Sequence, residues 1–199
     1  TPKGALVAVH LPASYTDSDQ DVLFAGLARA AKRWGCPIVG GNVSRAPTLV
    51  LTTTVLGTTP RPLRRSGARP GDCVQVAGTL GAAALGLAAF LRGAEDEANR
   101  DAALEPFRRA FRDPEPKLAA GLLARGQATA AIDVSDGFVQ DLGHLAKASG
   151  VTIALDPSLV DALAFPLRAG AAALGIDGRH AVLHGGEDYA LVVTARELL

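Results

Sequence analysis

The sequence predicts an α/β protein with layered helices and strands, comprising one complete domain and part of another. Strand-like and helix-like segments alternate along the chain, which is typical of a layered α/β domain with a parallel or mixed sheet. The 199 residues are many for one domain and few for two, because a domain takes roughly 100 to 200 residues. Hydrophobic residues make up 48% of the chain and charged residues 20%, which is sufficient apolar surface for a packed core.

The first part of the chain predicts a strand, a helix and two more extended segments. Aspartates gather where the helix begins, and the helix dipole favours negative charge there. In order, the pattern predicts a strand at residues 5–11, a helix from Asp17 that ends at Gly35, an apolar run at 37–39 leading into a turn at Gly40 and Gly41, and a strand at 48–56.

A segment rich in proline and glycine, residues 61–72, predicts a linker between two domains. We place the boundary after residue 62, which gives domains at 1–62 and 63–199. The second domain begins the alternation again. Its residue pattern predicts, in order, a strand at 73–77, a glycine turn at 78–81, a helix at 82–92, a charged solvated loop at 94–101, a helix at 116–125, a strand at 129–133, a helix from Phe138 to Gly150, and strands at 151–155 and 189–194.

The composition excludes several classes of partner and location. The 20 basic and 20 acidic residues cancel, so we expect neither nucleic acid nor a membrane as a partner. Only two cysteines occur, each in an apolar run, which indicates buried thiols in a reducing, cytoplasmic setting. Neither a membrane-spanning stretch nor a signal peptide is predicted. Because the chain begins with Thr1 and contains no methionine, we expect its natural start to be missing or processed.

The segment AAIDVSDGFVQDL, residues 130–142, is the strongest candidate for chemistry. A predicted strand ends at Asp133 and a helix begins near Asp136, so two carboxylates and the Ser135 hydroxyl converge at one strand end. Such hard oxygen ligands suit Mg²⁺. The alternative is that Ser135 or Asp136 caps the helix, and the sequence leaves both interpretations open.

Three further segments have a binding and a structural interpretation. VGGNVSRA at 39–46 offers glycines and an arginine to a phosphate, or forms an ordinary turn. GGEDY at 185–189 places two acids where they could bind a substrate cation, or is a solvated loop. GTLGAAALG at 78–86 offers free helix N–H groups to a phosphate but lacks the Lys and Ser/Thr of a P-loop. His180 and His184 have the spacing of zinc ligands on a helix, although packing or surface roles are favoured.

The succession of these segments resembles the thiamine-monophosphate kinase family. GGNVSR, RRSGARPGD, GTLGAAALGL, AAIDVSDGFVQDLGHLAKASG and GGEDYAL follow one another over nearly the whole chain, and the fourth and fifth are the specific ones. A more distant similarity extends to aminoimidazole ribonucleotide synthetase, selenophosphate synthetase and a hydrogenase maturation factor. The resemblance implies an aminoimidazole ribonucleotide synthetase-like fold of two domains, with an incomplete N-terminal domain at 1–62 and most of the C-terminal domain at 63–199.

The resemblance also implies an activity, which is transfer of the γ-phosphoryl group of ATP to thiamine monophosphate, giving thiamine diphosphate. Mg²⁺ is the implied cofactor, and alignment with charge neutralisation suits two anionic reactants. Motif by motif, it implies metal binding by Asn42, Asp133 and Asp136, nucleotide binding by Gly41, Asn42, Arg65 and Ser135, substrate binding by Glu187, and charge neutralisation by Arg65 and Asp136.

The chain departs from the family pattern at two positions, since Asn42 and Ala82 stand where the family has Asp. Asn keeps an oxygen ligand without its charge, which weakens a magnesium site, and Ala donates nothing. The resemblance further implies a homodimer with its active site between the two domains. It also implies N-terminal metal-binding acids and a C-terminal aromatic residue that this sequence lacks, so the fragment alone is not expected to turn over.

Three rival interpretations stay open. The chain could come from another ATP-dependent synthetase of the same superfamily, although neither cysteine lies in the glycine-rich loop of a selenophosphate synthetase. Asn42 and Ala82 motivate a non-catalytic ligand-binding or regulatory relative. A plain structural α/β domain is the third, because single motifs can mislead.

Overall fold

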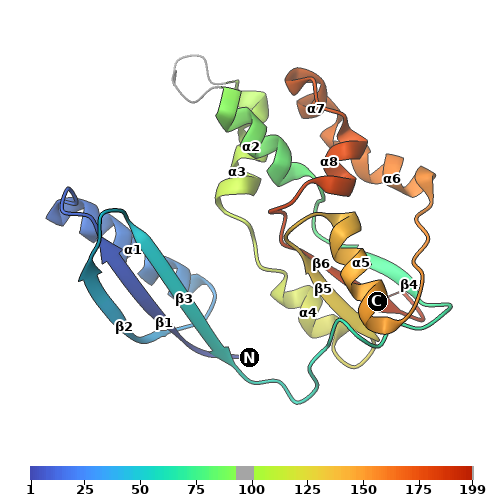
Figure 1. Ribbon diagram of the computed structural model, residues 1–199, viewed down its shortest axis with the longest axis horizontal. Helices are drawn as coiled ribbons and strands as arrows, with labels where there is room; N and C mark the ends of the chain where they lie inside the picture. Colours follow the sequence, from blue (N-terminus) through green and yellow to red (C-terminus); the bar gives the residue numbers. More distant parts are fainter. Residues whose placement is uncertain (93–100, 199) are drawn as a thin grey trace. The chain divides into compact units, whose positions relative to one another are not determined.

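The computed structural model describes residues 1–92 and 101–198. The chain forms two compact units, Thr1–Pro60 (unit 1) and Arg61–Leu199 (unit 2) (Figure 1). The loop predicted at 94–101 lies outside the described residues except for Asp101, whose carboxylate caps the short 3-10 helix η2 (Ala102–Leu104) by accepting the Ala103 N–H at 2.9 Å.

Unit 1 is a three-stranded sheet with one helix. Its elements are β1 (Pro2–Leu11), α1 (Asp17–Arg33), β2 (Ile38–Arg45) and β3 (Val50–Gly57). β1 lies in the middle of the sheet, parallel to β2 and antiparallel to β3. The predicted order of strand, helix, strand and strand is therefore confirmed, and this sheet is mixed.

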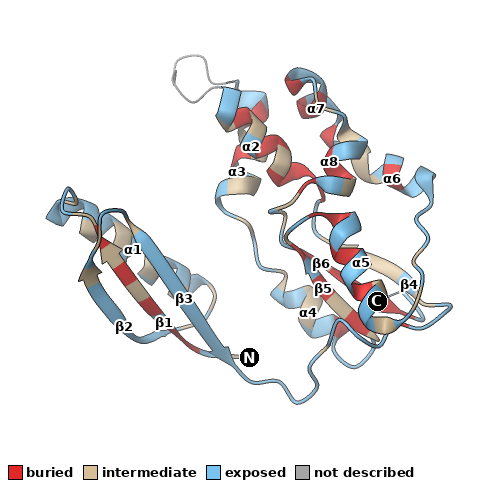
Figure 2. Ribbon diagram, viewed as in Figure 1, coloured by how far each residue is buried: buried red, intermediate tan, exposed pale blue. Residues whose placement is uncertain are grey.

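Alternate residues of β1 form the core of unit 1, because successive side chains of a strand point to opposite faces. Val7, Val9 and Leu11 are buried, and Leu23 and Leu27 of α1 pack against them (Figure 2). The helix therefore covers the face of the sheet to which these odd-numbered residues of β1 point.

The turn predicted at Gly40 and Gly41 is wrong, because β2 continues through both glycines beside Leu6 and Val7 of β1. Gly41 has a φ of 152°, and a Cβ added there would lie 1.9 Å from the Val7 carbonyl oxygen. Glycine is thus required by close approach of two strand backbones. A close approach and a turn call for the same residue, so the sequence pattern did not separate them.

Unit 2 is built on an antiparallel three-stranded sheet. Its strands are β4 (Cys73–Ala77), β5 (Ala130–Val134) and β6 (Ala190–Ala195), and β6 lies between the other two and antiparallel to both. The alternation of elements predicted a parallel or mixed sheet, and for unit 2 that expectation is wrong. The reason is that the chain reverses direction through the helices between β5 and β6, so β6 returns antiparallel to both neighbours.

Short helices surround this sheet in unit 2. They are α2 (Ala82–Arg92), α3 (Glu105–Arg112), α4 (Leu118–Ala124), α5 (Phe138–Ser149), α6 (Pro157–Ala164), the 3-10 helix η3 (Phe165–Leu167), α7 (Arg168–Leu174) and α8 (Gly178–His184). Leu85 of α2, Leu145 of α5 and Val182 of α8 are completely buried with Val192 of β6 in one hydrophobic core (Figure 2). None of the described helices is by itself long and apolar enough to cross a membrane.

The strand predicted at 151–155 is wrong, because residues 151–156 have no regular structure. Val151 and Ile153 do pack against the core, while Thr152 and Ala154 are exposed. The alternation of apolar residues is therefore real, but the described residues provide no strand with which this segment pairs.

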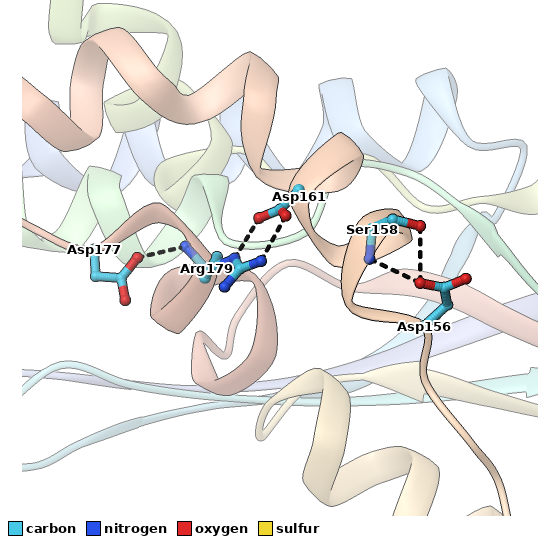
Figure 3. A network of polar contacts seen from close by, with 5 residues as sticks. All are labelled: Asp156, Ser158, Asp161, Asp177 and Arg179. Atoms are coloured by element: carbon cyan, nitrogen blue, oxygen red, sulfur yellow. Dashed lines mark hydrogen bonds and ion pairs between the residues drawn. The ribbon is translucent and has the colours of Figure 1, made fainter.

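A polar network joins two of the helices that the sequence analysis left unassigned (Figure 3). Asp156 accepts the Ser158 N–H at 2.8 Å and so caps α6, and Asp177 accepts the Arg179 N–H at 2.9 Å and so caps α8. The Arg179 guanidinium forms a two-point ion pair with Asp161, which links α8 to α6. Both helix starts thus carry the Asp that commonly caps helices.

Candidate functional site

Three loops with candidate motifs meet at one edge of the unit 2 sheet. Ala77, the last residue of β4, pairs with Leu191, and Val134, the last residue of β5, pairs with Ala190. Because β6 is antiparallel to both strands, the loops after β4 and β5 and the loop before β6 lie at the same edge (Figure 1). The segments GTLG, DVSDG and GGEDY are therefore brought together.

The DVSDG loop is shaped by a carboxylate that it does not contain. Asp141, in the first turn of α5, is only 3% exposed, and its Oδ2 accepts the backbone N–H groups of Ser135, Asp136 and Gly137 at 3.0, 3.1 and 3.2 Å. Charge-assisted bonds of this kind are among the stronger hydrogen bonds in proteins. The loop is consequently fixed without using its own side chains.

This arrangement argues against the interpretation of Ser135 or Asp136 as a helix cap. Gly137 is the N-cap residue of α5, and it makes no side-chain cap. The structure shows no bond from the Ser135 or Asp136 side chain to the start of α5, and the N–H groups of the loop itself are bound to Asp141. Asp136 is exposed, and so is Asp133 at the end of β5. Both carboxylates are therefore available for a ligand.

The GGEDY loop packs directly on the DVSDG loop. The Glu187 N–H donates to the Ser135 carbonyl oxygen at 2.9 Å, and the Tyr189 N–H donates to the Val134 carbonyl oxygen at 2.9 Å. A Cβ added to Gly186 would lie 2.6 Å from the Ser135 carbonyl oxygen, so only glycine permits this contact. The two motifs that carry the family resemblance form one structural unit.

The two acids of GGEDY point in different directions. Glu187 is exposed, whereas Asp188 is partly buried, and its carboxylate accepts the Gly81 N–H at 2.6 Å and the Ala83 N–H at 2.9 Å at the start of α2. Burial raises the pKa of Asp188, and the N–H donors act against that increase. Two of the N–H groups that the GTLG turn was expected to offer to a phosphate, those of Gly81 and Ala83, are thus bound to Asp188.

The charges of three exposed acids act on the hydroxyl of Tyr189. That hydroxyl donates to Glu187 Oε2 at 3.2 Å. Its pKa is raised by partial burial, then by the bond to Glu187, and then by the negative charges of Glu187, Asp133 and Asp136. The same negative field attracts a cation to this edge of the sheet.

The residues present fit a magnesium ion that keeps much of its water. Mg²⁺ is commonly held by one or two carboxylates together with substrate phosphates. Asp133, near the end of β5, and Asp136, in the loop after it, provide two such carboxylates. In the part of the chain that the structure describes, no three or more His, Cys, Asp or Glu side chains form a complete metal cage. An ion here therefore needs ligands from a substrate or from other chain segments.

Arg65 lies on the segment that runs beside β5. The Arg64 carbonyl oxygen accepts the Ala131 N–H at 2.9 Å, and the Arg65 carbonyl oxygen accepts the Ser149 hydroxyl at 3.1 Å. The Arg65 side chain is exposed. The structure therefore fixes its backbone close to β5 and leaves its guanidinium available, but it shows no contact between Arg65 and Asp133 or Asp136.

Gly41 and Asn42 belong to β2 of unit 1, whereas the other predicted site residues belong to unit 2. Asn42 is exposed beside Ala8. Two positions further along the same strand, the Ser44 hydroxyl lies 2.6 Å from Nδ1 of His10, a pair that the sequence analysis did not single out. Asn42, Ser44 and His10 share one face of the sheet, because paired and alternate positions point the same way.

His180 and His184 lie on α8 with their ring centroids 4.9 Å apart. Both are exposed, and neither belongs to a group of three metal-binding side chains among the described residues. Backbone atoms of His184 pack on Gly137, where an added Cβ would lie 3.1 Å from the His184 carbonyl oxygen. The exposed side chains fit a surface role, one of the two roles favoured for the pair.

A cavity of about 740 Å³ lies elsewhere in unit 2, among β4, residues 150–156 and α6. Its lining is largely apolar and includes Val74, Val76 and Ile153. None of the three exposed carboxylates at the sheet edge lines it. The cavity and the carboxylate cluster are thus separate features.

Two domain families match this arrangement. AIR synthase related protein, N-terminal domain, matches residues 1–59, and AIR synthase related protein, C-terminal domain, matches residues 69–195. The chain belongs to the AIR synthase related family. The expected aminoimidazole ribonucleotide synthetase-like fold is thereby confirmed.

Family members with more specific names match the chain over part of their length. Thiamine-monophosphate kinase of Mycobacterium tuberculosis is 38% identical over 190 residues, which are 94% of this chain and 55% of the relative. Thiamine Monophosphate Kinase from Aquifex aeolicus has a TM-score of 0.86 at 30% identity, covering 98% of this chain and 66% of that one. AaThiL complexed with AMPPCP and TMP has a TM-score of 0.84 at 30% identity, covering 98% and 62%. The chain therefore spans somewhat more than half of these relatives.

Sequence reasoning missed the two acids that shape the site in this family member. Asp141 lies in the segment at 130–142, but it was assigned no role of its own. Asp188 received the same interpretation as its neighbour Glu187. A signal for Asp141 was present, because an acid in the first turn of a helix lies near N–H groups that lack helical partners. No comparable signal existed for Asp188, because its partners Gly81 and Ala83 are more than 100 residues away in the chain.

Proposed function

We propose that the protein to which this chain belongs transfers the γ-phosphoryl group of ATP to the phosphate of thiamine monophosphate, giving thiamine diphosphate. The observation that carries the proposal is the pair of exposed carboxylates, Asp133 and Asp136, on a loop that Asp141 already satisfies. Relatives named thiamine-monophosphate kinase, and a relative structure that holds AMPPCP, an ATP analogue, together with TMP, support the assignment.

The residues of this chain take different roles in the proposal. Asp133 and Asp136 would hold Mg²⁺, which when bound neutralises charge on the transferring phosphates. Arg65 would add positive charge at the phosphates, and Ser135 would lie against the nucleotide. Glu187 would face the thiamine substrate, whose thiazolium ring is cationic. Gly41 and Asn42 would complete the nucleotide and metal sites from unit 1.

The proposed step requires alignment more than acid–base chemistry. An oxygen of the thiamine phosphate forms the new P–O bond, and the bond between the γ-phosphorus and its bridging oxygen to ADP breaks. The attacking oxygen is already anionic, so no side chain has to remove a proton. The rigid contact between the DVSDG and GGEDY loops serves this alignment, because it fixes the metal-binding acids relative to Glu187.

The proposal includes a homodimer in the cytoplasm. Unit 1 exposes several large apolar side chains on β2 and β3, distributed over both faces of its sheet, and a partner chain would cover part of this surface. They are Val43, Val50, Leu51, Val55 and Leu56. Cys36 and Cys73 are free thiols, which fits a reducing compartment. The expectation that both are buried is wrong, because Cys36 is half-buried and Cys73 is exposed. Sedimentation of the full-length protein at two concentrations tests the dimer.

Calorimetric titration of the full-length protein tests the activity assignment. AMPPCP and thiamine monophosphate are titrated with and without Mg²⁺, for the unaltered protein, for Asp136→Ala, and for Asp156→Ala, which removes a helix cap away from the site. We expect Mg²⁺-dependent AMPPCP binding that is lost only in Asp136→Ala, together with thiamine monophosphate binding. Nucleotide binding without thiamine monophosphate binding would favour another synthetase of the superfamily, and binding of neither would favour a non-catalytic relative.

A further inference from the structure

We propose that Asp188 is a positioning residue, whose carboxylate ties the GGEDY loop to the first turn of α2 and thereby fixes the backbone that presents Glu187 to the substrate. The inference deepens the proposed function and rests on it for the role of Glu187. Asp188 itself is not placed in contact with substrate, since its oxygens accept the Gly81 and Ala83 N–H groups at 2.6 and 2.9 Å.

The backbone around Asp188 indicates that the loop must be held in place. Glu187 has a φ of 66° and Tyr189 a φ of 46°, so residues with side chains occupy the left-handed region on both sides of Asp188. That conformation is unfavourable for residues other than glycine and persists only where surrounding contacts enforce it. Asp188 supplies such contacts from the side of α2.

The opposite side of the loop is held by β5. The Glu187 N–H bonds to the Ser135 carbonyl oxygen and the Tyr189 N–H to the Val134 carbonyl oxygen, both at 2.9 Å. The loop is thus fixed at three consecutive residues, two through the backbone and the middle one through its side chain. With the Asp188 side chain turned inward, the Glu187 side chain is exposed.

The start of α2 also benefits from this carboxylate. Helix N-termini favour negative charge, and their first N–H groups lack partners within the helix. A cap taken from more than 100 residues away links two segments that a local cap would leave independent. Packing supports the link, because a Cβ added to Gly185 would lie 2.9 Å from the Ala84 side chain and 2.3 Å from the Ala181 carbonyl oxygen.

Kinetics of the full-length protein distinguish positioning from simple capping. Asp188→Asn keeps the shape of the side chain, but its NH₂ group faces an N–H donor. We expect the KM for thiamine monophosphate to rise about tenfold, as the loss of a charge-assisted bond would cause, with the KM for ATP changed less than about twofold. The effects of Asp188→Asn and Glu187→Gln on this KM should not be additive in the double variant, because both changes act through the Glu187 carboxylate. Asp156→Asn, the same change of side chain at the cap of α6, should leave both KM values unchanged.

Hydrogen exchange gives a readout that does not depend on the reaction. In Asp188→Asn, and not in Asp156→Asn, the amides of Glu187 and Tyr189 should exchange about tenfold faster, together with those of Gly81 and Ala83. If the unaltered protein does not phosphorylate thiamine monophosphate, the proposed function fails, while the exchange result still decides whether Asp188 fixes the loop.

Two results would overturn the inference. One is an unchanged exchange rate at Glu187 and Tyr189, which would mean that β5 alone holds the loop. The other is a lower melting temperature with unchanged KM values or additive effects, which would make Asp188 only a helix cap. Should Asp188→Asn fail to fold, Asp188→Ser replaces it, because a serine hydroxyl can accept one of the two N–H groups.

Discussion

The Asp141 carboxylate accepts the backbone N–H of Asp136 at 3.1 Å. Asp141, on α5, thereby shapes the preceding loop, from which the Asp136 side chain is exposed. The two aspartates differ in exposure, since Asp141 is buried and Asp136 faces solvent. We therefore expect mutation of Asp141 to lower stability and mutation of Asp136 to weaken ligand binding.

Asp141→Ala should lower the free energy of unfolding of unit 2 by about 2 kcal/mol, because three N–H groups lose a buried, charged acceptor. Urea unfolding of the full-length protein checks this expectation. Asp177→Ala, which removes the single cap bond of α8, serves as the control and should cost about 1 kcal/mol. Equal losses in the two variants would show that the three bonds to Asp141 have no special weight.

Asp136→Asn should leave the melting temperature nearly unchanged and strongly weaken Mg²⁺-dependent nucleotide binding. Its side chain is exposed and caps no helix, so removing its charge affects only a ligand. Thermal unfolding and calorimetry with AMPPCP, each with and without Mg²⁺, measure the two properties. Retained Mg²⁺-dependent binding would remove Asp136 from the proposed metal site, and a large stability loss would show a structural role.

Local signals in the sequence predicted most elements that hold the site. The strand predicted to end at Asp133 ends at Val134, and the helix predicted from Phe138 to Gly150 and the glycine turn before α2 lie where their turn and cap residues placed them. Composition and periodicity act over a few residues, so they identify elements of this size well. The order of the motifs then identified the family.

The interactions that complete the site were not visible in the sequence because they join distant residues. Asp188 reaches Gly81, and Glu187 bonds to the backbone of Ser135, contacts that depend on the antiparallel return of β6. Strand direction in turn depends on the helices α6 to α8, which the sequence analysis left unassigned although Pro157 follows a capping Asp. All the site roles stay predictions, namely those of Gly41, Asn42, Arg65, Asp133, Ser135, Asp136 and Glu187.

Gly41→Ala should destabilise unit 1 by about 3 kcal/mol or more, because a Cβ there would lie 1.9 Å from the Val7 carbonyl oxygen and the φ of 152° is unfavourable for alanine. Gly26→Ala is the matched control. It lies within α1, where the nearest atom to an added Cβ is 3.8 Å away, and alanine should stabilise a helix there by about 0.5 to 1 kcal/mol. Chemical unfolding followed by Trp34 fluorescence reports on unit 1, and similar effects of both changes would contradict the strand contact.

Asp72 should make the stability of unit 2 vary with pH in the acidic range. The Thr129 hydroxyl donates to its carboxylate at 2.6 Å and is the main cause that holds the pKa of Asp72 below its ordinary value of 3.8. A lowered pKa in the folded state stabilises the fold above 3.8, and this contribution is lost as the pH falls through the folded-state pKa. The advantage in melting temperature of the unaltered protein over Asp72→Asn should therefore be full at pH 6 and shrink below about pH 4.

Thr129→Val tests the cause of this pH dependence, because it removes the donor and leaves the carboxylate. Melting curves at several pH values between about 3 and 6 should show a similar loss of pH dependence for Thr129→Val and for Asp72→Asn. In the double variant the effects should overlap, since both changes remove the same bond. A constant gap between the unaltered protein and Asp72→Asn across this range would mean that the bond to Thr129 does not favour the charged form of Asp72.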